Sequence, residues 1–467
     1  MSGSVNRRVN SSLAQRAGQY GWAPVLILSS TLVVESGQRM ALSQAVEGIQ
    51  GEFGISDVQM SLLPFSMALL GALGAIPIGI LSDRVRRTWL LAAAMAIWTV
   101  ATGLLALSTT VAALLVLHMI LGAVEANAPA SISLISDYYP VRSRARMLGL
   151  YSAGSLLGAL AGLVLGGVVV KYFGWRWAFA MWVPLGLLTV AWLWTLPEPR
   201  RGDRDREFER SLTERPEPPS DGVGGPAHRP RDLALPAPRK TGHLDYAGLS
   251  QWAAFRELIG IRSMWFAMLG LGTQQMLLNG LSFWAVEFLR RTHDLDSAMA
   301  GVLAGGLALG AAVGVVAGGF IADRMFGRGV INARVWVTGL AAIGAAAVLA
   351  PAFASSNLAV TASLMLVGGF LITLPMAPAD AILNDVVVSH LRGRAVALRS
   401  VVRSIGMVGP VIIGALSSII GLQAALIVFT PTYAVGGLIV LLALRHYPQE
   451  LAFVVAESRR ERLSRDE

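Results

Sequence analysis

The stretch GILSDRVRR, residues 79–87, returns in altered form as GFIADRMFGR, residues 319–328. Each copy follows a long apolar run and carries arginines around its aspartate, and Asp83 and Asp323 lie about half the chain length apart. A second echo pairs RSRARMLGL, which starts at Arg142, with LRGRAVAL, which starts at Leu391. The chain therefore repeats itself once, which predicts two halves that are built alike.

The composition is that of a membrane protein. Of the 467 residues, 54% are hydrophobic and only 14% are charged, whereas soluble domains carry about 25% charged residues. A helix needs roughly 20 apolar residues to cross a bilayer, and such runs recur along the whole chain. We therefore predict an all-α membrane protein with twelve transmembrane helices, over residues 22–46, 58–81, 88–108, 111–137, 146–170, 176–196, 261–289, 297–322, 333–353, 358–387, 394–420 and 422–444.

The predicted spans divide into two parallel bundles. Six spans per half is an even number, so both halves enter the membrane from the same side, and two such bundles with a site between them form a transporter layout. Residues 197–259 are rich in proline, arginine and acidic side chains, which predicts a largely disordered linker with one amphipathic surface helix at 245–258. The expected domains are a bundle over 1–196, the linker over 197–259, a second bundle over 260–445 and a tail over 446–467.

The arginines predict the orientation. They gather in the loops after the even-numbered spans, whereas the first loop, EGIQGEFGISD, carries no positive charge. The positive-inside rule therefore places both termini in the cytoplasm of a multi-pass protein of the cell (inner) membrane. Because residues 1–20 are polar and no small-residue cleavage site follows the first apolar run, we expect no cleavable signal peptide. Membrane orientation explains the net charge of +9 better than binding to nucleic acid does, so no nucleic-acid partner is expected.

Several functional classes are disfavoured by what the sequence lacks. The chain has no cysteine, which excludes disulfides, thiolate metal sites and cysteine nucleophiles. It contains no Gly-x-x-x-x-Gly-Lys-[Ser/Thr] loop, so ATP-driven pumping is disfavoured. We therefore expect no enzyme, no cofactor and no metal site. A non-transporting receptor is the less favoured alternative, since neither the linker nor the tail offers a structured signalling domain.

The two repeated loops resemble the signature of the major facilitator superfamily, roughly Gly-x-Leu-Ala-Asp-Arg-x-Gly-Arg-Arg. Gly79, Asp83, Arg84 and Arg87 match it, and Val85 stands where a glycine is usual. Within that superfamily the chain is similar to spinster-like transporters. The segments that carry this likeness are GEFGISDVQMSLL, EANAPASISLISDYYPVRSRA, FGWRWAF and NGLSFWAVEFLRR.

The resemblance implies a secondary active transporter that works by alternating access. Spinster-like proteins are associated with lysophospholipids and sphingoid lipids, often with proton coupling, so an amphiphilic lipid such as a lysophospholipid is the expected substrate. Proton-coupled drug efflux or sugar transport is the alternative. The expected partners are this small substrate, protons and membrane lipids, and the protein is expected to act as a monomer.

The first and fourth spans carry the expected coupling groups. Where spinster-like proteins have an aspartate before the arginine of the first helix, this chain has Gln38 before Arg39, and Glu35 lies one turn earlier. In the fourth span His118 replaces the family's arginine, while the acid is kept as Glu125. The resemblance also makes these cavity-lining positions, because the superfamily lines its cavity with the first, fourth, seventh and tenth helices.

Two interpretations of these charges stay open. Glu35 and Arg39 stand at i,i+4 with the acid first, the favoured order for a self-neutralising pair within one helix. Alternatively, Arg39 binds an anionic head group or carboxylate while Glu35 or Glu125 takes the proton, because burial raises the pKa of a carboxylic acid and a nearby arginine lowers it again. Glu125 is the favoured proton carrier.

The second half adds further polar candidates. Gln275 and Asn279 stand at i,i+4 in the seventh span, and Asp380 and Asn384 do so in the tenth. Asp380 is either a second protonatable group or, as we favour, a structural partner of Arg403, because leaving either charge uncompensated would be expensive. Trp284 is assigned to the aromatic belt at the outer surface.

A third group is assigned to a gate at the cytoplasmic face. By resemblance, the motif aspartates and their arginines tie helices together in one transport state and do not bind substrate. The predicted gate residues are Gly79, Asp83, Arg84, Arg87, Asp323, Arg324 and Arg399.

Overall fold

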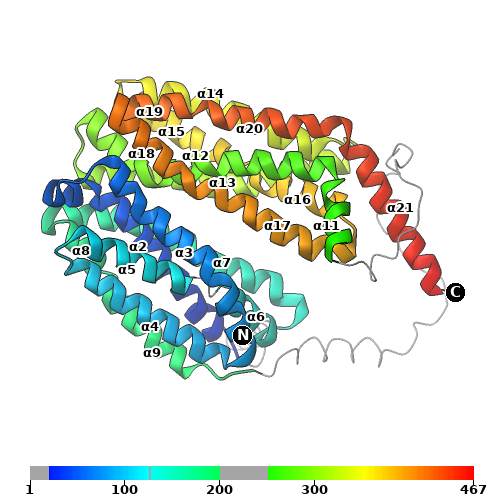
Figure 1. Ribbon diagram of the computed structural model, residues 1–467, viewed down its shortest axis with the longest axis horizontal. Helices are drawn as coiled ribbons and strands as arrows, with labels where there is room; N and C mark the ends of the chain where they lie inside the picture. Colours follow the sequence, from blue (N-terminus) through cyan, green and yellow to red (C-terminus); the bar gives the residue numbers. More distant parts are fainter. Residues whose placement is uncertain (1–19, 126–127, 200–250, 467) are drawn as a thin grey trace, which may run out of the picture. The chain divides into compact units, whose positions relative to one another are not determined.

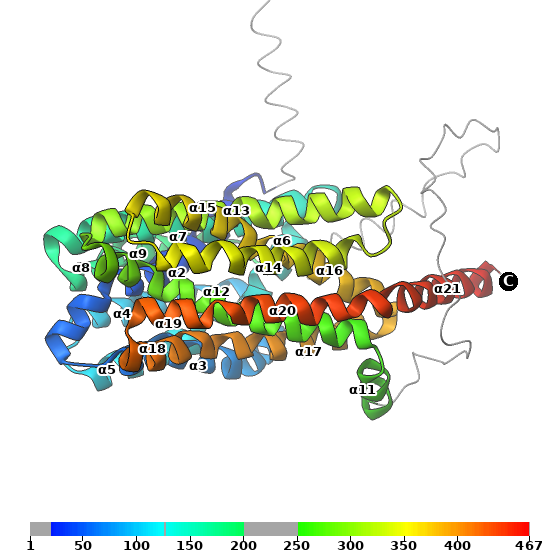
Figure 2. The ribbon, with the colours of Figure 1, turned by 90° about the horizontal axis from the view of Figure 1, so that it is seen from above.

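The computed structural model describes residues 20–125, 128–199 and 251–466, and these residues form helices, turns and short loops without a strand. The chain separates into two compact units. Helices α2 to α9, with residues 296–302 at the start of α13, belong to the first unit, and the remaining helices, α11 to α21, belong to the second. Figures 1 and 2 show the helices of each unit.

The first unit contains the N-terminal helices. They are α2 (Ala23–Phe53), α3 (Asp57–Arg84), α4 (Arg87–Ala106), α5 (Val111–Glu125), α6 (Ala128–Tyr138), α7 (Val141–Phe173), α8 (Trp175–Ala180) and α9 (Val183–Thr195). The second unit contains α11 (Gln251–Ile259), α12 (Arg262–His293), α13 (Ser297–Gly327), α14 (Ala333–Ala354), α15 (Leu358–Thr373), α16 (Met376–Val386), η1 (Ser389–Leu391), α17 (Arg392–Ser404), η2 (Ile405–Val408), α18 (Gly409–Ile420), α19 (Leu422–Phe429), α20 (Pro431–Leu441), η3 (Leu442–Arg445) and α21 (Tyr447–Asp466).

The helices confirm the predicted fold class. Among the described residues, ten helical stretches are long and apolar enough to cross a membrane. The other two predicted spans are α2 and α12, with 31 and 32 residues, each longer than a crossing requires. These two helices carry the polar side chains of the first and seventh spans, which lower their hydropathy.

Several spans that the sequence predicts as single helices are interrupted near prolines. The sixth breaks before Pro184, the tenth at Pro375, the eleventh just before Pro410 and the twelfth before Pro431. Proline removes a backbone donor and clashes with the preceding turn. Such breaks are tolerated in membrane bundles because groups on neighbouring helices satisfy the freed backbone atoms. Each interrupted span can therefore still cross the membrane.

Helices α2 and α7 pack with their backbones in close approach. A Cβ atom at Gly154, Gly158 or Gly162 would lie 2.2–2.4 Å from a carbonyl oxygen of α2. Between these contacts the hydroxyls of Ser36 and Ser155 are hydrogen-bonded at 2.8 Å. Small residues at four-residue spacing are the usual way for membrane helices to pack this tightly, and three of the six glycines from Gly149 to Gly167 make this contact.

The segment predicted as the C-terminal tail forms the helix α21. The beginning of α21 buries Tyr447, Leu451 and Val454 in the core of the second unit. The described part of the predicted surface helix is α11, and Figure 2 shows it turned away from α12 at one end of this unit. The linker residues 200–250 lie outside the described residues.

Candidate functional site

An ion pair joins two membrane helices of the first unit. The guanidinium of Arg39, on α2, contacts the carboxylate of Glu125 at the end of α5. The side chains keep 44% and 26% of their surface exposed, so neither charge is sealed into the helix packing. The structure therefore brings together the predicted anion-binding group and the favoured proton carrier.

Two more predicted residues lie beside this pair on α2. Glu35 and Gln38 are buried, with 4% and 1% of their surface exposed. Within the described residues, neither the oxygen nor the nitrogen of the Gln38 amide has a hydrogen-bond partner. Leaving a buried polar group unpaired costs about 1–3 kcal/mol. Gln38 therefore lies within the helix packing, and its amide is not exposed as Arg39 and Glu125 are.

His118 lies in the core of the first unit. Its side chain is fully buried, its Nδ1 is 2.8 Å from the carbonyl oxygen of Leu114, and its ring packs edge-on against Phe179. This position fits a structural role in the helix packing.

In the second unit, the structure corrects the predicted partner of Asp380. The carboxylate pairs with Arg399 at 2.6 Å, not with Arg403. Arg403 lines the same small cavity, of about 20 Å³, together with Gln275 and Asp380. Arg399 and Arg403 lie one turn apart on α17, and the earlier turn is the one that reaches the acid. Arg399, predicted as a gate residue, is thus held within its own unit.

The other predicted polar residues of α12 and α16 make local contacts, and their place in a substrate cavity stays a prediction. A Cβ atom at Gly406 of η2 would lie 2.4 Å from Cβ of Gln275 and 3.2 Å from Nδ2 of Asn279. These two side chains therefore sit where η2 crosses α12. Asn384 donates to the backbone oxygen of Asp380 at 3.1 Å, one turn back on its own helix.

The assignment of Trp284 to an outer aromatic belt is wrong. Its side chain is fully buried, and its indole N–H donates to the carbonyl oxygen of Pro410 at 3.0 Å. This hydrogen bond ties α12 to the first turn of α18. The next turn of α12 carries Glu287, an acid that sequence reasoning missed; it is buried and pairs with Arg291 at 2.7 Å.

Arg87, predicted as a gate residue, is the centre of a buried network in the first unit. Only 2% of its surface is exposed. Its guanidinium contacts Asp137 of α6 at 2.5 Å and Glu198, beyond α9, at 2.9 Å. It also donates to the hydroxyl of Ser133 at 2.7 Å. Arg87 therefore ties the start of α4 to α6 and to the chain that follows α9.

Glu198 is held ionised by the same network. Burial by itself raises the pKa of its carboxyl, but hydrogen bonds from the backbone of Thr88 and from Arg87 outweigh this effect and hold the pKa below its usual value. The charged form is therefore the stable one in the folded protein.

The second unit repeats this arrangement around Arg334. Its guanidinium contacts Asp385 and lies 3.2 Å from Asp323. The same guanidinium lies over the ring of Phe326, and the hydroxyl of Tyr447 also contacts Asp385. Burial, together with the negative charge of Asp385, raises the pKa of the Tyr447 phenol, so this hydroxyl acts as a donor. Arg334 thus joins α13, α14, α16 and α21.

Sequence reasoning missed Asp137, Glu198, Arg334 and Tyr447. The signal for one pair was present: Asp137 stands seven residues before Arg144, and Asp385 stands seven before Arg392, so the second repeat extends upstream to both acids. Of the predicted gate residues, Arg84 and Arg324 are exposed and Asp323 keeps 68% of its side chain exposed. The surroundings of Gly79 and the side chain of Asp83 lie outside the described part of the chain, so the gate role of both residues stays a prediction.

Comparison with known proteins identifies the family of the chain. The family model of the Major Facilitator Superfamily matches residues 28–408 and 285–465. The probable sphingolipid transporter spinster homolog 1 of Arabidopsis thaliana is 25% identical over 362 residues, 76% of this chain and 70% of the relative. The D-galactonate transporter of Escherichia coli O6:H1 is 25% identical over 321 residues, 68% of this chain and 70% of the relative.

A solved structure shares the fold. It is the crystal structure of a bacterial homolog to the human lysosomal transporter Spinster, in an inward-facing and unoccupied conformation. It has a TM-score of 0.75 and 20% sequence identity, over 93% of this chain and 99% of that chain. With the family model matching most of its length, the chain belongs to the Major Facilitator Superfamily of membrane transporters.

Proposed function

We propose that the protein is a proton-coupled, alternating-access transporter of an anionic amphiphile such as a lysophospholipid. The observation that carries the proposal is the partly exposed ion pair between Arg39 and Glu125. Charges inside membrane spans are costly and mark substrate or ion pathways by default. In this proposal Arg39 binds the anionic head group and Glu125 carries the proton.

The pair supplies a coupling mechanism. While Glu125 is ionised it occupies Arg39, so an anionic substrate must compete with it. Protonation of Glu125 removes that competitor and frees the guanidinium. Proton binding and anion binding then favour each other, and by linkage each raises the affinity for the other by the same factor.

An amphiphile is the first candidate substrate because the chain is similar to a probable sphingolipid transporter. A sugar acid is the second candidate, since the chain is similarly close to a D-galactonate transporter and a carboxylate also suits Arg39. Drug efflux remains the other alternative from the sequence. The two candidates differ in size and polarity, so direct uptake measurements separate them.

Reconstitution into liposomes tests the proposal. Labelled lysophosphatidic acid and labelled galactonate are offered separately, with and without an imposed pH gradient. We expect lysolipid uptake above that of empty vesicles and a dependence on the gradient that Glu125→Gln abolishes. Glu52→Gln is the control, because Glu52 is an acid at the far end of α2 that pairs with Arg176. Galactonate flux without lysolipid flux would reassign the substrate, and an unchanged pH dependence in Glu125→Gln would overturn the assigned proton carrier.

A further inference from the structure

Arg403, on α17, carries a charge inside a membrane span that the second unit leaves uncompensated. It belongs to a stretch, Arg394–Ile420, that is long and apolar enough to cross a membrane. Its side chain is exposed, and within the described residues no carboxylate pairs with its guanidinium. A charge inside a span is costly and marks a substrate or ion pathway by default. We therefore expect an anion from outside the chain to bind at this position.

The acid that shares a cavity with Arg403 is already neutralised. Asp380, on α16, pairs at 2.6 Å with Arg399, which lies one turn before Arg403. One carboxylate thus faces two guanidinium groups, and the three side chains together carry one excess positive charge. An anion that arrives at Arg403 consequently has no carboxylate to displace, whereas at Arg39 it must compete with Glu125.

A small recess connects Arg403 with α12. It has a volume of about 20 Å³, and Gln275 lines it from α12, opposite the charged groups of α16 and α17. Only 6% of the surface of Gln275 is exposed, and its amide makes no hydrogen bond to any described residue. The recess has room for about one water molecule. It can therefore admit one oxygen of a larger anion, and the Gln275 amide can donate to that oxygen.

The surface around Arg403 is polar although it lies in the spans. Ser400 on α17 and Asn384 on α16 are both exposed, and both helices belong to stretches that can cross a membrane. Polar side chains at this depth face protein or a water-filled cavity and avoid lipid. A dissolved anion, or the head group of an amphiphile, can therefore reach Arg403.

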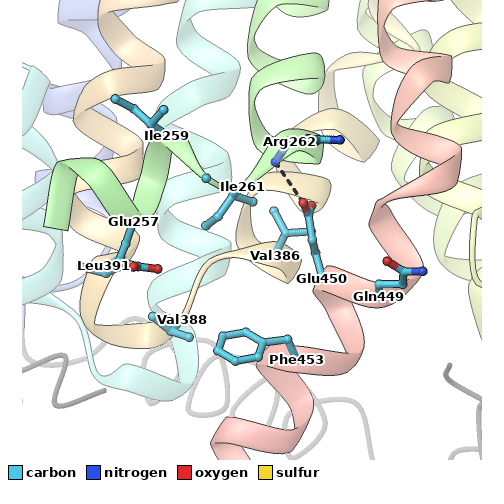
Figure 3. Close-up of a pocket in the computed structure, with 11 residues that line it drawn as sticks. Glu257, Ile259, Ile261, Arg262, Val386, Val388, Leu391, Gln449, Glu450 and Phe453 are labelled. Atoms are coloured by element: carbon cyan, nitrogen blue, oxygen red, sulfur yellow. Dashed lines mark hydrogen bonds between the residues drawn. The ribbon is translucent and has the colours of Figure 1, made fainter. Parts of the chain in front are cut away.

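The helices that face α17 are held at their ends. Figure 3 shows Glu450 of α21 beside the start of α12, which it caps by accepting from the backbone N–H groups of Arg262 at 2.9 Å and Ser263 at 3.1 Å. At the end of α16, Asp385 contacts Arg334 of α14. Binding groups on helices that are fixed in this way are preorganised.

We propose that Arg403 and the amide of Gln275 form an anion-binding position in the second unit, which takes phosphate or carboxylate oxygens of the transported substrate. A guanidinium presents planar donors that match the geometry of such oxygens. One oxygen enters the recess beside Gln275, and the others contact Arg403 from its open side. The inference rests on the proposed function only because it takes the transported anion as the ligand. The position itself belongs to the second unit and does not depend on the Arg39–Glu125 pair.

Equilibrium binding to the purified full-length protein in detergent tests the position without transport. The probes are labelled lysophosphatidic acid, labelled galactonate and, as the uncharged comparison, a monoacylglycerol with the same chain as the lysolipid. Arg403→Gln should weaken binding of the anion by about 10- to 100-fold, the loss expected for a charge-assisted hydrogen bond, and Gln275→Leu by about two- to tenfold. Binding of the monoacylglycerol should not change. Arg403→Lys keeps the charge and should lose less affinity than Arg403→Gln.

Arg394→Gln is the matched control. Arg394 stands nine residues before Arg403 on α17, which places it on the opposite face of the helix, and it does not line the recess. This variant should bind the anions like the parent. Because no described carboxylate pairs with Arg403, Arg403→Gln should also melt like the parent, so that a weaker affinity reports the site and not a loss of fold.

The outcomes separate this position from the transport proposal. Unchanged affinity for both anions in Arg403→Gln, an equal loss in Arg394→Gln, or a parent that binds neither anion would overturn the position. A loss in Arg39→Gln without a loss in Arg403→Gln would keep the role proposed for Arg39 and overturn that of Arg403, and the opposite result would do the reverse. Binding of galactonate instead of the lysolipid would change the substrate but keep the position, provided that Arg403→Gln weakens it.

Discussion

Replacing Arg87 with methionine should strongly destabilise the first unit. The change removes the partner of two acids, Asp137 and Glu198, which are 2.5 Å and 2.9 Å from the guanidinium. Breaking a buried ion pair by removing one partner costs about 3–5 kcal/mol, because an uncompensated charge stays buried. In a unit of this size each kcal/mol lowers the melting temperature by about 2–4 °C, so the expected drop is about 6–20 °C.

Tryptophan fluorescence during heating of the purified protein in detergent measures this drop. Arg86→Met is the matched control, because the adjacent Arg86 is exposed and only lies over the ring of Trp89; it should cost about 1 kcal/mol or less. The triple variant Arg87→Met, Asp137→Asn, Glu198→Gln carries no unpaired charge and should regain much of the lost stability. A melting temperature for Arg87→Met within 2 °C of the parent would refute the reasoning, and so would a triple variant less stable than the single one.

Three further outcomes follow from the packing and the charges. Gly158→Leu should cost about 3 kcal/mol, the upper end of what overpacking usually costs, because its Cβ would meet a carbonyl oxygen of α2 at 2.2 Å. Gly149→Ala faces open space and should melt like the parent, and equal melting temperatures for the two variants would contradict the close helix contact. Glu198 has a lowered pKa, so its stabilisation is complete above its unfolded pKa of about 4.3 and is lost as the pH falls through the lowered folded value; Glu198→Gln should flatten the acid limb of a melting-temperature profile, and an identical limb would count against this network. Trp284→Phe removes the hydrogen bond from the buried indole to the Pro410 carbonyl and should cost about 0.5–1.5 kcal/mol in chemical denaturation, an effect that a lipid-facing belt residue would not show.

The site could be predicted only in part. Arg39, Glu125, Glu35 and Gln38 were identified because charged and amide side chains are rare inside apolar spans, and each such residue is expensive enough to need a reason. Their partners were less accessible. Asp380 was assigned to Arg403, whereas the structure pairs it with Arg399, one turn earlier on α17. Spacing along a chain identifies a helix face, but which turn of the next helix meets it depends on how the two helices cross.

Hydropathy and internal repetition by themselves determined the larger architecture. Bilayer thickness sets the length of each apolar run, so the spans, the two halves and the repeated loops could be read without coordinates. The tertiary structure alone decided which charges meet. Arg87 is 50 residues from Asp137 and 111 from Glu198 in the sequence, and Glu450 caps a helix 188 residues away. Such contacts arise from the packing of helices whose local sequence patterns are independent of one another. The local pattern of one helix therefore does not predict which residues of another helix it contacts.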